Sequence, residues 1–120
     1  ALLNCDEMAL FDGSGTSSLS LISAKQFTSL FIFAKNQFHL DADLLAALPM
    51  LKLNPSIKGV PCFIRAILST EGNVTSVAGI IETHQKKKIV CCCIVNNAHR
   101  EKEKAESFLN AFCQTLFENL

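Results

Sequence analysis

The three histidines of this chain are the first candidates for acid–base or metal chemistry, because imidazole titrates near neutral pH and binds transition metals. His39, His84 and His99 fall in three separate connections between the predicted elements. None has a cysteine or carboxylate partner at the spacing of a zinc site or a catalytic triad. We therefore interpret them as surface or capping residues.

The six cysteines are the next candidates, because thiolates bind zinc and form disulfides. Cys91, Cys92 and Cys93 are consecutive in the apolar run KKKIVCCCIVNN. Successive side chains of a strand point to opposite faces and the chain has no CxxC pair, so no four-ligand zinc site is expected. The others are isolated along the chain: Cys5, Cys62 and Cys113. We interpret the cysteine run as core packing in a reducing compartment, with no metal or cofactor.

Two further groups of polar residues lack the surroundings that chemistry requires. Asp41 and Asp43 lie two apart at a predicted helix start, where they complement the helix dipole. Ser14 lies in DGSGTSS, which has neither the GxSxG elbow nor the strand–helix setting of a phosphate-binding loop. The spacing of reactive residues alone therefore identifies no active site.

Composition limits the class of protein. The chain has 120 residues, of which 49% are hydrophobic and 18% charged, and this fits one small folded domain over residues 1–120. Eleven basic residues balance eleven acidic ones, and the one basic run, Lys86–Lys88, lies in a predicted turn. This neutrality argues against a nucleic-acid-binding domain. No apolar run is long enough to cross a membrane.

Two helices are predicted in the N-terminal half. Ser23 followed by Gln26 has the spacing of a capping box, which predicts a helix that begins there. Apolar residues at helical spacing make one face of this helix: Phe27, Leu30, Phe31 and Ala34. Asp41 is predicted to cap a second, shorter helix, which Pro49 should end.

A sheet is predicted in the second half. Residues 50–61 contain two prolines and are predicted to be a connector. Strands follow at about 62–68, 74–82 and 88–96, and the short turns between them imply antiparallel neighbours. The third strand is apolar on both faces, so it should be covered on both sides.

A last helix completes the chain. Asn96 or Asn97 is predicted to cap it, with Glu101 and Glu103 near its positive end. Its apolar stripe comprises Ala105, Phe108, Leu109, Phe112, Cys113 and Leu116. The nine phenylalanines are assigned to the core. The predicted fold class is α+β, with an antiparallel sheet of at least three strands flanked by helices.

Four segments occur in an order that is typical of one protein family. They are FDGSGTSSLSLISAKQF, LLAALP, IRAILSTEGNVTSVAGIIET and KKKIVCCCIVNN. In turn they resemble DGSGLSR, F…ASLP, VRAKTGTLxxVxxLAGYVxT and GxxLAFSILVNN, which belong to the C-terminal part of the penicillin-binding D-alanyl-D-alanine carboxypeptidases that also act as endopeptidases on peptidoglycan. The resemblance covers most of the chain and implies part of a serine β-lactamase/transpeptidase-like fold.

The resemblance also implies where the chemistry of that family has been lost. The family uses the motifs S-x-x-K, S-x-N and K-T-G, the last on an edge strand that holds the substrate. In this chain the K-T-G positions correspond to Ile67, Leu68 and Ser69, followed by Thr70. The replacements remove a cation and a hydroxyl, and they add bulk where the substrate backbone approaches closely. The other two motifs lie upstream of this segment in the family, so no catalytic residue is assigned here.

These observations leave three hypotheses for function. In the first, the chain is a C-terminal segment of a carboxypeptidase-like protein of the periplasm or cell envelope that is inactive by itself and binds peptidoglycan peptides or a protein partner. In the second, an upstream or partner chain supplies S-x-x-K and S-x-N and completes an active serine-type carboxypeptidase. In the third, the likeness is accidental and the chain is a non-enzymatic α+β interaction module, whose apolar third strand pairs with a partner or a second copy.

Overall fold

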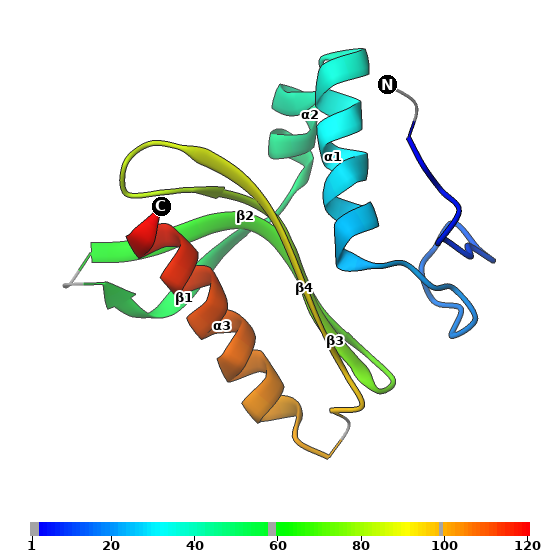
Figure 1. Ribbon diagram of the computed structural model, residues 1–120. Coiled ribbons are helices and arrows are strands. Elements are labelled where there is room, and N and C mark those ends of the chain that lie inside the picture. Colours follow the sequence, from blue (N-terminus) through cyan, green and yellow to red (C-terminus); the bar gives the residue numbers. More distant parts are fainter. Residues whose placement is uncertain (1–2, 58–59, 99) are drawn as a thin grey trace.

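Three helices and four strands make up the chain in the computed structural model, which describes residues 3–57, 60–98 and 100–120, with the backbone alone for 54–57 and 60–62. The helices are α1 (Ala24–Phe38), α2 (Asp41–Ala47) and α3 (Lys102–Asn119). The strands are β1 (Met50–Ile57), β2 (Val60–Glu71), β3 (Val74–Glu82) and β4 (Lys88–Asn96). Helices lie on both sides of one antiparallel sheet, which confirms the predicted α+β class (Figure 1).

The sheet is a meander in which each strand pairs with its neighbour in sequence, in the order β1-β2-β3-β4. β3 and β4 span the predicted residues, and β2 extends beyond the prediction at both ends. Glu71 pairs with Val74 across the β2–β3 turn, and Gly72 has a φ of 55° there, a conformation that glycine adopts without a side-chain clash. The short turns therefore produce the antiparallel neighbours that the sequence predicted.

The prediction of a connector over residues 50–61 is wrong, because Met50–Ile57 forms the strand β1. β1 is an edge strand, and its pairing with β2 loses register between Leu53 and Ile57, the interval that contains Pro55. Proline lacks a backbone N–H, but edges and bulges tolerate it because no ladder hydrogen bond is required there. The proline signal therefore marked an irregularity within a strand and not its absence.

The helix caps agree with the sequence only at α1. The Ser23 hydroxyl accepts a hydrogen bond from the Gln26 amide at 3.2 Å, and the Gln26 side chain accepts one from the Ser23 amide at 3.4 Å, which confirms the capping box. The prediction that Asp41 caps α2 is wrong, because Asp41 is already the first helical residue and Leu40 precedes it as N-cap.

The predicted cap of α3 is also wrong. Asn96 ends β4 and Asn97 has a left-handed φ of 60°, so both residues belong to the turn that leaves the sheet. The helix begins after Glu101, which makes no side-chain cap. Glu103 lies in the first helical turn, where its charge complements the helix dipole as predicted.

The main core lies between α3 and one face of the sheet. Its buried residues come from α3 and all four strands: Leu53, Ile64, Ala66, Val77, Ile81, Cys91, Leu109 and Cys113. α1 lies on the other side of the sheet and packs against β4 (Figure 1). All β4 side chains from Ile89 to Val95 are at least partly buried, which confirms that this strand is covered on both faces.

The assignment of all nine phenylalanines to the core is wrong. Phe31 is buried, but four rings have 47% to 65% of their surface exposed: Phe11, Phe38, Phe63 and Phe108. For the two on helices, Phe38 and Phe108, the physical reason is that one four-stranded sheet covers only a narrow stripe of each helix, so residues beside that stripe stay in solvent.

Replacing Gly79 by alanine should destabilise the sheet. A Cβ atom at Gly79 would lie 2.5 Å from the Cα of Ala66 on β2 and would also overlap the Arg65 carbonyl oxygen. We expect Gly79→Ala to lower the free energy of unfolding by about 1–3 kcal/mol, measured by urea denaturation. The control is Gly13→Ala, whose new Cβ meets nothing within 4 Å and should change the value by less than about 0.5 kcal/mol. Equal stability of the two variants would contradict the close approach of β2 and β3.

Candidate functional site

The four residues at the K-T-G-like positions, Ile67 to Thr70, lie in the second half of β2, which has a free edge. β1 pairs with β2 only from Val60 to Arg65, whereas the β2–β3 pairing continues to Glu71. In the part of the chain that the structure describes, residues 67–71 therefore have a strand neighbour on one side only. β2 lies second in the sheet and is not an edge strand as a whole, but the half that carries these positions lacks a neighbour on one side.

The backbone groups of Leu68 and Thr70 point toward this free edge. The Ala66 amide donates to the Pro49 carbonyl at 3.0 Å, so the backbone of Ala66 faces the β1 side, away from β3. The direction of backbone groups repeats every second residue along a strand, so Leu68 and Thr70 face the same way. Beyond Ala66, however, β1 no longer runs alongside. The edge thus offers donors and acceptors about 7 Å apart to another extended chain.

The side chains flanking these backbone groups are mostly apolar and exposed. Ile67 has 50% of its surface exposed and Leu68 has 44%, while Ser69 is exposed and Thr70 is half-buried. Alternation places Ile67 and Ser69 on the α1 side of the sheet, and Leu68 and Thr70 on the α3 side. An extended peptide on this edge would therefore meet an apolar side chain on each face.

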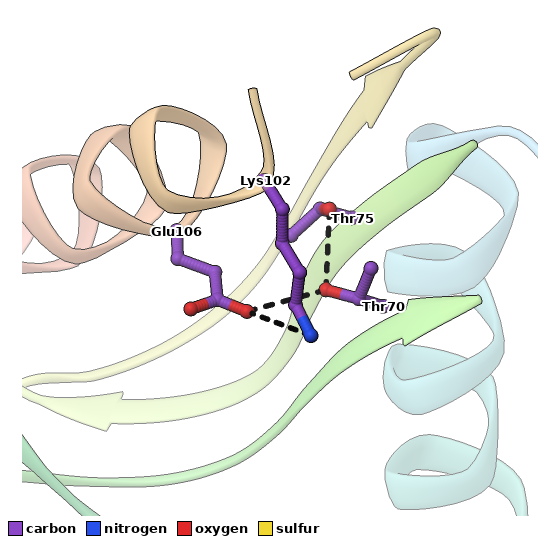
Figure 2. A network of polar contacts seen from close by, with 4 residues as sticks. All are labelled: Thr70, Thr75, Lys102 and Glu106. Atoms are coloured by element: carbon purple, nitrogen blue, oxygen red, sulfur yellow. Dashed lines mark hydrogen bonds and ion pairs between the residues drawn. The ribbon is translucent and has the colours of Figure 1, made fainter. Parts of the chain in front are cut away.

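Thr70 is held by a polar network that connects the edge to α3 (Figure 2). Its hydroxyl lies 3.2 Å from the hydroxyl of Thr75 and donates to the Glu106 carboxylate at 3.4 Å. Lys102 forms an ion pair with the same carboxylate at 3.8 Å. Thr75 is 1% exposed, so Thr70 provides a hydrogen-bond partner for a buried hydroxyl. Sequence reasoning missed Glu106, because only the packing of α3 on the sheet brings it to β2.

The hollows that the described residues are known to line do not include residues 67–71. A cavity of about 540 Å³ lies near the other end of β2, where Phe63, Arg65, His84 and Lys88 are among its lining residues. The Arg65 guanidinium donates to the Leu48 carbonyl at 3.3 Å, so one of its N–H donors is already used within the protein. The edge at residues 67–71 is therefore an open surface suited to an extended chain and not an enclosed small-molecule pocket.

The cysteines of β4 confirm the predicted role in packing. Cys91 and Cys113 are buried in the main core, and Cys93 packs against it. A hydrogen bond from Cys113 lowers the pKa of the Cys91 thiol, against the opposing effect of burial. Burial, together with the charges that Cys91 and Cys93 can carry, raises the pKa of Cys92 to about 11. The side chain of Cys62 lies outside the described residues.

The other candidates of the sequence also have structural roles. His39 caps the C-terminus of α1 with a left-handed φ of 54°, and the exposed ring of His84 lies 6.4 Å from that of Phe117, which confirms the interpretation as capping and surface residues. His99 lies outside the described residues. The Ser14 hydroxyl donates to Asp12 at 2.9 Å, and this bond, with others from the same turn, lowers the pKa of Asp12.

Comparisons of the chain with protein family models, with curated proteins and with solved structures found no match. Within the described ranges, no helix is long and apolar enough to cross a membrane. The same residues contain no group of three or more His, Cys, Asp or Glu side chains that could hold a metal ion.

Replacing Thr70 by valine should destabilise the protein through Thr75. The buried Thr75 hydroxyl would lose its partner, and an unsatisfied buried hydroxyl costs about 1–3 kcal/mol. We expect the free energy of unfolding of Thr70→Val to fall by that amount in urea denaturation. Thr70→Ser keeps the hydroxyl and should lose less. An equal loss in both variants would contradict the role of the hydroxyl, because Thr70→Ser keeps the hydroxyl whereas Thr70→Val keeps only the methyl group.

Alkylation should distinguish the cysteines by their environment. Thiolate is the reactive form, and a pKa of about 11 at Cys92 leaves roughly 100-fold less thiolate at neutral pH than the ordinary value of 9.0 would. We expect iodoacetamide at pH 7.5 to modify the exposed Cys5 well before Cys92, measured by peptide mass spectrometry. In denaturant this difference should disappear. Equally fast modification in the folded protein would contradict the burial of Cys92.

Proposed function

We propose that this chain acts as a C-terminal segment of a D-alanyl-D-alanine carboxypeptidase-like protein, and that it binds peptides of peptidoglycan without cleaving them. The observation that carries the proposal is the free edge at residues 67–71 of β2. These residues include the positions that resemble the substrate-holding K-T-G motif. The resemblance also supports a location in the periplasm or cell envelope, and we follow it over the reducing compartment that the unpatterned cysteines favour.

The edge has the chemistry that an extended peptide requires. Outward backbone groups of Leu68 and Thr70 can pair with the backbone of a peptide, as an added strand does at other sheet edges. The exposed side chains of Ile67 and Leu68 supply apolar contacts on the two faces. Main-chain hydrogen bonds give affinity in this mode of binding, and flanking side chains give selectivity.

The same residues argue against catalysis by this chain. Isoleucine at position 67 offers no positive charge to a substrate carboxylate. At Thr70, the Glu106 carboxylate accepts the hydroxyl hydrogen bond, and Lys102 forms an ion pair with the same carboxylate. Acyl transfer needs free donors or positive charge where an oxyanion develops, and these groups are already engaged with one another. The edge therefore suits binding better than reaction.

Fluorescent penicillin and a short cell-wall peptide test the proposal together. We expect no covalent adduct with the penicillin, and no D-alanine released from diacetyl-L-lysyl-D-alanyl-D-alanine. The peptide should still bind at millimolar concentration and slow hydrogen exchange at the Leu68 and Thr70 amides, measured by NMR. A stoichiometric penicillin adduct would instead support an active carboxypeptidase.

Two variants at one position provide the control. Leu68→Pro removes the outward amide and should abolish peptide binding, whereas Leu68→Ala keeps that amide, loses only the apolar contact of the side chain, and should weaken binding without abolishing it. If Leu68→Pro is folded, as checked by circular dichroism, and still binds the peptide, the edge of β2 is not the binding site. No binding by the parent chain would reject the proposed peptide-binding function.

A further inference from the structure

The outer edge of β4 is a second free strand edge, and it is longer than that of β2. β4 pairs with β3 in an unbroken register of nine residue pairs, from Glu82 with Lys88 to Val74 with Asn96. β4 is the last strand of the sheet, and among the described residues no strand pairs with its other side. Its backbone on that side therefore lacks the partner that a central strand would have.

The outward groups can be assigned residue by residue. The Thr83 amide donates to the Lys87 carbonyl at 2.8 Å, so the backbone of Lys87 faces β3. The direction repeats every second residue, which turns the groups of Ile89, Cys91, Cys93 and Val95 toward β3. Those of Val90, Cys92 and Ile94 consequently point outward. Three residues thus present regularly spaced donors and acceptors to a neighbouring strand.

Although α1 packs against β4, the strand itself has none of the sequence or register features that keep exposed strands from pairing. Proteins protect such edges with charges, prolines, bulges or very short strands. β1, the opposite edge, has a break in register in the interval that contains Pro55. Between Lys88 and Asn96, by contrast, β4 has no charged residue, no proline and no bulge. The segment IVCCCIV is a regular apolar strand, and its outward backbone groups can pair with a further strand.

The charges at the start of β4 define the partner. Lys86 forms an ion pair with Glu82 at 3.3 Å, whereas Lys87 and Lys88 are exposed and have no acidic partner within the described ranges. A second copy of β4 contains no acidic residue, and in antiparallel pairing it would place the polar Asn96 beside Lys88. Such a dimer would add no carboxylate to this end, where Glu82 is opposite Lys88 and already forms an ion pair with Lys86.

We propose that the outer edge of β4 binds an extended protein segment that adds a fifth, antiparallel strand to the sheet. The segment has apolar residues at alternate positions and acidic residues at its C-terminal end, where antiparallel pairing brings them beside Lys87 and Lys88. Strand addition supplies the backbone hydrogen bonds, and the acidic end fixes direction and register. The proposal does not depend on peptide binding at β2, because β3 separates the two edges.

A synthetic strand with the sequence acetyl-Thr-Val-Thr-Val-Thr-Val-Thr-Glu-Glu-amide is the probe. We expect it to slow hydrogen exchange at the Val90, Cys92 and Ile94 amides at least 10-fold, measured by NMR. The inward amides of Cys91 and Cys93 should be slow already and change little. A peptide ending in Lys-Lys in place of Glu-Glu should bind at least 10-fold more weakly. Equal binding of the two peptides would overturn the proposed charge complementarity.

Two substitutions at Cys92 separate edge pairing from folding. Cys92→Pro removes one outward amide and should lower affinity for the Glu-Glu peptide at least 10-fold, while Cys92→Ser keeps the amide and should stay within about 3-fold. Slow exchange at the inward amides checks that each variant is folded. If Cys92→Pro does not fold, the comparison of the Glu-Glu and Lys-Lys peptides on the parent chain still tests the proposal. Protection of the outward amides in dilute protein without peptide would overturn the proposal, and so would protection that rises with protein concentration, which would indicate a second copy. Absence of any protection by the peptide would overturn it as well.

Discussion

The close approach of β3 and β2 at Gly79 and Ala66 is the constraint on which the rest of the structure depends. Only a residue without a side chain fits opposite Ala66 at this distance, so the two strands meet with small groups at their centre. Larger residues on the same face, such as Val77 and Ile81, then lie beside this point and receive Leu109 and Cys113 of α3. The core is therefore organised around the middle of β3, which is paired along both sides.

The unequal lengths of the strands decide which parts of the sheet remain free. β3 pairs with β4 along its whole length and with β2 from Val74 to Ile80, but β1 accompanies only the first half of β2, and β4 has a neighbour on one side. Two stretches of backbone consequently face outward with apolar side chains around them. Apolar side chains are exposed as well, among them Ile67, Leu68 and several phenylalanines. They leave apolar surface in solvent where another chain can contact it.

Local signals in the sequence predicted much of the fold. The Ser23–Gln26 capping box, the bounds of β3 and β4, and the packing of Cys91 are all present, since each depends on neighbouring residues or on a simple alternation. The errors arose where tertiary contacts override local preference. The prolines around β1 concealed a strand that its pairing with β2 stabilises, and Asn97 follows the turn out of β4 and does not cap the next helix.

The sequence by itself determined the types of residue at the candidate site: isoleucine, leucine and serine at positions 67–69 where the similar family has lysine, threonine and glycine. It also determined the hairpins, because turn residues and alternation act over a few positions. Only the tertiary structure decided that the edge beside Leu68 and Thr70 is free and that Glu106 reaches Thr70. It also placed β4 at the end of the sheet. These features depend on which distant segments become neighbours, and no local pattern in the chain encodes that choice.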